Sequence, residues 1–90
     1  MKFLGIDYGT KRIGVALSDD GGTIAFPRAV LVNSPGIGTE IAALVRAEGV
    51  ASVVVGESRA SRGGENPLQR EIARFAYALE GALPDVRVVF

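Results

Sequence analysis

The chain has 90 residues, of which 48% are hydrophobic, and its ten basic and ten acidic residues cancel. This length predicts a single domain over residues 1–90, and the hydrophobic content excludes a disordered protein. Zero net charge excludes a general attraction of the whole molecule to nucleic acid, so any such contact must be local. Cysteine and histidine are absent, so a metal site must use oxygen ligands, which suit magnesium, calcium or manganese better than zinc.

The first apolar run is too short for a secretion signal or a membrane span, because Asp7 interrupts it. The lack of cysteine is compatible with a reducing compartment. We therefore expect a cytoplasmic protein that has no membrane partner.

Three apolar runs predict a three-stranded antiparallel meander at the start of the chain. The run Lys2–Tyr8 has apolar residues on both faces, which predicts a central strand in a sheet covered on each side. Ile13–Ser18 alternates large and small residues, and Asp19–Gly22 predicts a hairpin turn. The third strand, Thr23–Val32, contains Pro27, which predicts an edge position or a bulge.

An amphipathic helix of about three turns is predicted next. It begins at Ile37 and ends before Gly49, which is expected just past the last turn. Ser34 is a candidate N-cap. The β-branched run Val50–Gly56 then predicts a buried parallel strand reached by a crossover connection.

A polar loop over Glu57–Asn66 follows that strand. Asn66 and Pro67 have the residue types that begin a helix, and the helix that follows carries a regular apolar stripe. The stripe consists of Leu68, Ile72, Phe75, Ala76, Leu79 and Leu83. Val86–Phe90 predicts a last strand. The order β-β-β-α-β-α-β predicts an α/β fold, a mixed sheet with helices packed on its faces.

Asp7 is the main candidate functional residue, because a carboxylate has no packing reason to stand in a strand pair. Burial of an unpaired charge is unfavourable, so we expect its side chain to be ion-paired, hydrogen-bonded or bound to a metal. From the residue type alone, hydrogen bonds to the turn amides of Gly9 and Thr10 explain an aspartate at this position as well as metal binding does.

Other polar residues are candidates for weaker reasons. Glu57 follows a buried strand, where active-site residues of open α/β sheets lie, although a solvated glutamate is the commoner case. Tyr8 is a candidate for stacking on a base, with packing as the alternative. Four basic residues could form a rim that binds phosphates, with ordinary turn charges as the alternative. They are Lys11, Arg12, Arg59 and Arg62.

The stretch Gly5–Asp19, GIDYGTKRIGVALSD, closely resembles the first motif of the YqgF family, also called RuvX-like. This is a family of proposed pre-16S rRNA nucleases and Holliday junction resolvases. The likeness extends more weakly to Val53–Gly56 and to the helix that follows. It implies a ribonuclease H-like fold and a nuclease whose carboxylates hold Mg²⁺ or Mn²⁺ against the scissile phosphate, and Asp7 matches the first of them.

The resemblance also implies structured RNA or branched DNA as the partner, with a role in 5′-end processing of pre-16S rRNA or in resolving DNA junctions. Thr10, Lys11 and Arg12 lie inside the matching motif and are the nearest candidates to contact phosphates.

The sequence departs from the family in two places. The family continues past its last strand into an acidic Asp-Glu-Arg-type motif and a final helix with another aspartate, whereas this chain ends at Phe90. The loop after Gly56 reads Glu57-Ser58-Arg59 where the family has a sequence like Leu-Pro-Leu-Asn. We therefore expect an amino-terminal part of the domain, or a short homologue, with little or no cleavage of its own.

Two alternatives belong to other classes of protein. The segment Gly5–Thr10 also looks like the first phosphate motif of actin-like ATPases and sugar kinases, which need two such domains to enclose a nucleotide. The second alternative is a domain without activity that forms a homodimer, because its last strand would lie at an exposed sheet edge.

Overall fold

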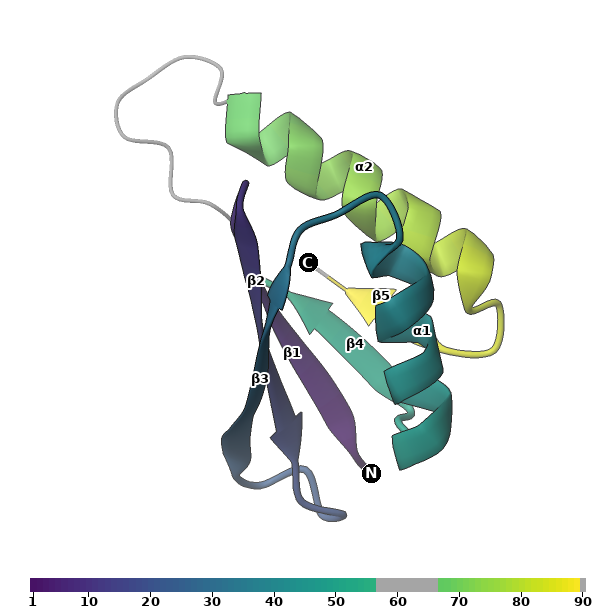
Figure 1. Cartoon of the computed structure of the whole chain (residues 1–90). Helices are drawn as coiled ribbons and strands as arrows, with labels where there is room; N and C mark the ends of the chain where they lie inside the picture. Colours follow the sequence, from purple (N-terminus) through teal and green to yellow (C-terminus); the bar gives the residue numbers. More distant parts are fainter. Residues whose placement is uncertain (57–66, 90) are drawn as a thin grey trace.

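A five-stranded sheet and two helices form the part of the chain that the computed structural model describes, residues 1–56 and 67–89 (Figure 1). The elements are β1 (Phe3–Tyr8), β2 (Arg12–Ser18), β3 (Ala25–Val32), α1 (Ile37–Glu48), β4 (Ser52–Val55), α2 (Pro67–Ala82) and β5 (Arg87–Val89). The predicted order of elements and the predicted α/β class are confirmed. Neither helix is long and apolar enough to cross a membrane.

The strands lie in the order β3-β2-β1-β4-β5, so β1 is central, as predicted. β1, β2 and β3 pair antiparallel, because short turns join them. β4 pairs parallel to β1, and β5 pairs parallel to β4, because a helix separates each of these strands from the one before it. The predicted meander and crossover strands are thus both present.

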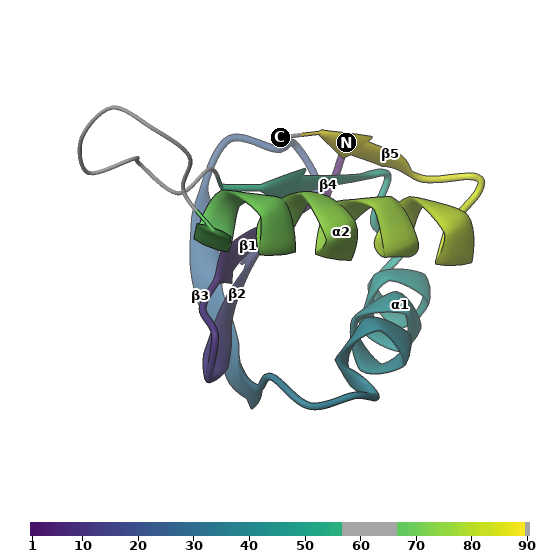
Figure 2. The same ribbon diagram turned by 90° about the horizontal axis from the view of Figure 1, so that it is seen from above.

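Both helices cover the same face of the sheet (Figure 2). In β1, Leu4 and Ile6 point into the core between the sheet and the helices, whereas Gly5 and Asp7 lie on the other face. The prediction that both faces of β1 are covered is therefore wrong for the described residues. The reason lies in the alternation of the strand, because Phe3 is the only large apolar residue that β1 places on its open face.

The β2–β3 hairpin confirms both predictions made from Pro27. β3 is an edge strand, and the pairing register shifts between Val15 and Ala16, which marks a bulge. The turn before β3 is held by Asp19, whose carboxylate accepts hydrogen bonds from the backbone N–H groups of Thr23 (2.8 Å) and Ile24 (3.3 Å). These bonds, that from Thr23 foremost, lower the pKa of Asp19. The strand consequently begins at Ala25, two residues later than predicted.

The helix ends agree with the sequence in part. Gly49 ends α1 in the left-handed conformation, with φ of 65°, as predicted. The N-cap position is Gly36 and no side chain caps it, so the prediction for Ser34 is wrong. The carbonyl of Ser34 instead accepts a hydrogen bond from the N–H of Ile37 (3.0 Å), in a turn that precedes the helix. α2 begins at Pro67 as predicted, and its proposed cap, Asn66, lies outside the described residues.

Candidate functional site

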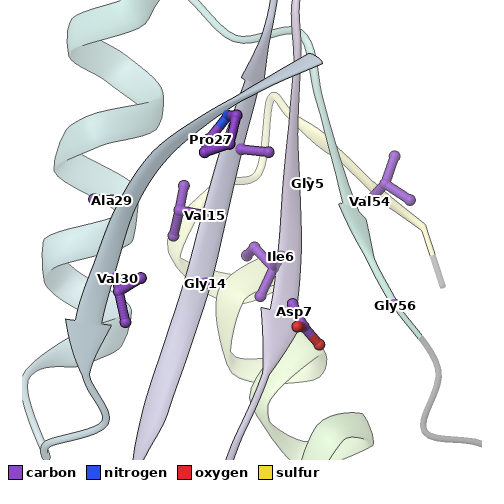
Figure 3. Close-up of a pocket in the computed structure, with 11 residues that line it drawn as sticks. Gly5, Ile6, Asp7, Gly14, Val15, Pro27, Ala29, Val30, Val54 and Gly56 are labelled. Atoms are coloured by element: carbon purple, nitrogen blue, oxygen red, sulfur yellow. The ribbon is translucent and has the colours of Figure 1, made fainter.

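Asp7 lies near the end of the central strand, on the face of the sheet that the helices leave open (Figure 3). Its side chain is exposed, and within residues 1–56 and 67–89 it has no hydrogen bond or ion pair. The prediction that turn amides hold this carboxylate is therefore not met by the described residues. An exposed carboxylate without a partner is free to bind a ligand from solution.

A shallow cavity of about 450 Å³ adjoins Asp7 on the open face. Gly5, Gly14 and other small residues line it, and Val30 and Val54 stand on opposite sides of it (Figure 3). A Cβ atom added to Gly5 would meet no atom within 4 Å, so the space above the strand is open. The open face thus leaves room beside Asp7 for a hydrated cation and a phosphate group.

The turn after β1 and the first residue of β2 carry three of the predicted phosphate-binding residues. Thr10, Lys11 and Arg12 are exposed, and neither cation forms an ion pair with a described residue. The turn is tight, because a Cβ atom at Gly9 would collide with the carbonyl oxygen of Arg12. The structure therefore brings these residues to the same end of the sheet as Asp7. Glu57, Arg59 and Arg62 lie outside the described residues.

Tyr8 points to the opposite side of the sheet from Asp7. Its ring packs on Phe75 of α2, with centroids 5.1 Å apart and an interplanar angle of 51°, which agrees with the packing alternative. Its hydroxyl donates a hydrogen bond to a carboxylate oxygen of Glu71 (2.9 Å). The pKa of Tyr8 is raised, mainly because the side chain is partly buried. A hydrogen bond with Asn33 lowers the pKa, and the interaction with Glu71 raises it.

Asn33 and Glu71 are residues near the site that the sequence analysis missed. The side-chain N–H of Asn33 donates to the carbonyl of Gly9 (2.9 Å), and its backbone N–H donates to the carbonyl of Lys11 (2.9 Å). Asn33 directly follows the β3 residue that pairs with Arg12, and its position at the end of the predicted hairpin is the one signal that points to it. Glu71 is 63 residues from Tyr8, and no local pattern predicts their contact.

Asp7 has the chemistry of a ligand for a hard cation, since Mg²⁺ and Mn²⁺ prefer oxygen donors. Among the described residues there is no group of three or more histidine, cysteine, aspartate or glutamate side chains that could hold a metal ion. Asp7 would therefore supply one ligand. This fits magnesium, which one or two carboxylates bind together with water and substrate phosphates.

The sheet order and the crossover connections place the chain in the ribonuclease H-like class of α/β folds. RuvC of Thermus thermophilus has this fold, with TM-scores of 0.66 alone and 0.70 in complex with a Holliday junction substrate. Each comparison covers 100% of this chain and about two thirds of RuvC (63% and 64%), at 20% sequence identity. The similarity therefore shows a common fold.

The family model "RuvX: Holliday junction resolvase" matches residues 1–90, and the chain belongs to that family. Relatives named "Putative pre-16S rRNA nuclease" include one from Oleidesulfovibrio alaskensis, which is 41% identical over 81 residues, and one from Syntrophus aciditrophicus, 41% identical over 88 residues. The matches cover 88% and 92% of this chain but 56% and 57% of those relatives. The chain thus spans little more than half of their length.

Proposed function

We propose that this chain carries the metal-binding strand of a nuclease that hydrolyses phosphodiester bonds with Mg²⁺ or Mn²⁺. The observation that supports the proposal is the exposed Asp7 carboxylate on the central strand, which has no partner among the described residues and lies beside an open cavity. Its place within the GIDYGTKRIGVALSD motif of a nuclease family adds to that support. In this proposal Asp7 is a metal ligand, and the protein acts in the cytoplasm.

The chemistry of each residue suits it to a different role in this proposal. Asp7 would hold a cation, and metal ions at such a site would supply activation of water and stabilisation of the leaving oxygen. Lys11 and Arg12 contact phosphates of the substrate, and such contacts position a nucleic acid without reading its sequence. Thr10 offers a hydroxyl to the same phosphates. Glu57, Arg59 and Arg62 remain predictions for the loop that follows β4.

The proposed substrate is the 5′ region of pre-16S rRNA, which the names of the curated relatives favour. Branched DNA is the other candidate, because the structure of Thermus thermophilus RuvC with a Holliday junction shares the fold. Both substrates present closely spaced phosphates of structured nucleic acid to the turn at Lys11 and Arg12.

Metal binding by the chain itself tests the role of Asp7. We expect Asp7→Asn to weaken Mn²⁺ binding at least about tenfold, since even the loss of a residue that merely orients a ligand costs that much. Asp85→Asn is the matched control, because Asp85 is exposed and has no described hydrogen bond or ion pair. Electron paramagnetic resonance of free Mn²⁺ measures both. Equal affinity in wild type and Asp7→Asn would remove Asp7 from the metal site.

Cleavage assays test the reaction and the substrate. The complete Oleidesulfovibrio alaskensis relative should cut a pre-16S rRNA leader, a four-way DNA junction or both, and only with Mg²⁺ or Mn²⁺ present. We expect little or no cleavage by the 90-residue chain. Thermal stabilisation of the chain by ATP, together with no cleavage of either substrate, would favour the nucleotide-binding alternative.

A further inference from the structure

The carboxylate of Asp7 has no partner among residues 1–56 and 67–89, but other parts of the chain hold the backbone that carries it. The carbonyl of Ile6, on one side, accepts a hydrogen bond from the N–H of Gly56 (2.9 Å). The carbonyl of Gly9, on the other side, accepts one from the side chain of Asn33 (2.9 Å). The residues that directly follow β3 and β4 therefore restrain both flanks of Asp7.

Tyr8 provides the third restraint, and it comes from α2. Its hydroxyl bonds Glu71 and its ring packs on Phe75, so two residues one helical turn apart hold the same side chain. Because neighbouring side chains of a strand point to opposite faces, fixing Tyr8 on the helix side also fixes the peptide that aims Asp7 at the open face. The contact thus links the helix layer to the orientation of the carboxylate.

The contact between Tyr8 and Glu71 is poorly explained by stability alone. The hydrogen bond is exposed to solvent, and an exposed bond of this kind contributes little to folding because water competes for both groups. The core beneath it is already formed by fully buried residues such as Leu4 and Ile72. Its more specific consequence is geometric, since a ligand on a rigid element binds its ion better than one on a mobile element.

We propose that Tyr8 is a positioning residue that fixes the orientation of Asp7 toward a divalent cation, with Glu71 as its anchor. This inference rests on the proposed function, because it takes Asp7 to be a metal ligand. Tyr8 itself faces away from the cation and does not touch it. Glu71 acts through its hydrogen bond to Tyr8, on the helix side of the sheet, and is not a metal ligand.

The test compares two tyrosines of this chain. Tyr8→Phe keeps the ring on Phe75 and removes the hydroxyl, while Tyr77→Phe makes the same change at an exposed site on α2. We expect Tyr8→Phe to weaken Mn²⁺ binding about tenfold, the usual effect of losing a residue that orients a ligand. It should also accelerate amide hydrogen exchange at Gly9 and Thr10. Tyr77→Phe should change neither.

Variants of Glu71 separate the hydrogen bond from the charge. Glu71→Gln keeps an oxygen that accepts the bond from Tyr8, so it should bind Mn²⁺ nearly as wild type does. Glu71→Ala should weaken Mn²⁺ binding in the same direction as Tyr8→Phe but by less, because Asn33 still bonds the Tyr8 hydroxyl. Equal losses in Glu71→Gln and Glu71→Ala would overturn the anchoring role, because they would show that the charge matters and the bond does not.

Asp7→Asn distinguishes a failure of this inference from a failure of the proposed function. If Asp7→Asn loses Mn²⁺ and Tyr8→Phe binds it as tightly as wild type, the positioning role is overturned and the metal site stands. If Asp7→Asn binds Mn²⁺ unchanged, the proposed function fails. Hydrogen exchange then tests whether Tyr8 restrains the backbone beside Asp7. Faster exchange at Gly9 in Tyr8→Phe supports that restraint, and unchanged exchange overturns it.

Discussion

Asp7 and Tyr8 are adjacent in the sequence, yet their side chains have opposite surroundings. Asp7 faces solvent and contacts no described partner, whereas Tyr8 is half-buried and bonded to α2. A hydrated cation requires the open surroundings of Asp7, and a rigid strand requires the packed surroundings of Tyr8. The alternation of β1 supplies both in consecutive residues.

Gly9 shows how strongly the turn beside Asp7 depends on one residue. We expect Gly9→Ala to lower the free energy of unfolding by about 1–3 kcal/mol, since the added methyl group collides with the backbone at Arg12 and the turn must distort. Thermal denaturation followed by circular dichroism measures the change.

The control for Gly9→Ala is Gly81→Ala, in the last turn of α2. An added Cβ there meets no atom within 4 Å, and alanine favours a helix over glycine by about 0.5–1 kcal/mol, so this variant should be stabilised. Two variants of equal stability would contradict the collision at Gly9.

At the scale of elements, the two faces of the sheet differ in what they contribute. The helix face holds the core, because α1 and α2 both place their apolar stripes on it. The open face holds the cavity and Asp7, and some of its apolar side chains are exposed, among them Val30 at 70%. Stability should therefore depend on the first face and ligand binding on the second.

Substitutions on the two sides measure this asymmetry. Leu79→Ala removes a fully buried side chain of α2 and should destabilise the protein by about 2–5 kcal/mol. Val30→Ala removes an exposed side chain of β3 and should stay within about 0.5 kcal/mol of wild type. Urea denaturation gives both values. A loss at Val30 as large as that at Leu79 would mean that the open face is covered in solution.

At the scale of the whole molecule, β3 and β5 form the edges of the sheet. β3 carries a bulge and Pro27, two features that discourage pairing with another strand, whereas β5 is a short strand of apolar residues and one arginine. The prediction that the last strand lies at an edge is confirmed. The homodimer predicted from it remains a prediction.

Light scattering tests that association. We expect the chain to dimerise at high concentration through β5, and we expect Val89→Lys to reduce the dimer fraction, because a charge on an edge strand disfavours pairing. Tyr77→Lys adds the same charge on the exposed face of α2 and should leave the dimer unchanged. A monomer at every concentration would contradict association.

Most of the fold could be predicted because its signals are local. The alternation of Ile13–Ser18, the glycine at position 49 and the apolar stripe of α2 each reflect which residues one element exposes or buries. The prediction for Ser34 fails because a serine before a helix has the same local signature whether or not its side chain reaches the first turn. The structure starts the helix too late for that contact.

The sequence by itself determined the order of elements and the family motif around Asp7, since these depend on neighbours along the chain. Only the tertiary structure decided that both helices cover one face, that Asp7 is exposed, and that Glu71 reaches Tyr8 across 63 residues. The physical reason is that these contacts join side chains far apart in sequence, and the apolar stripe of a helix does not by itself show against which strands it packs.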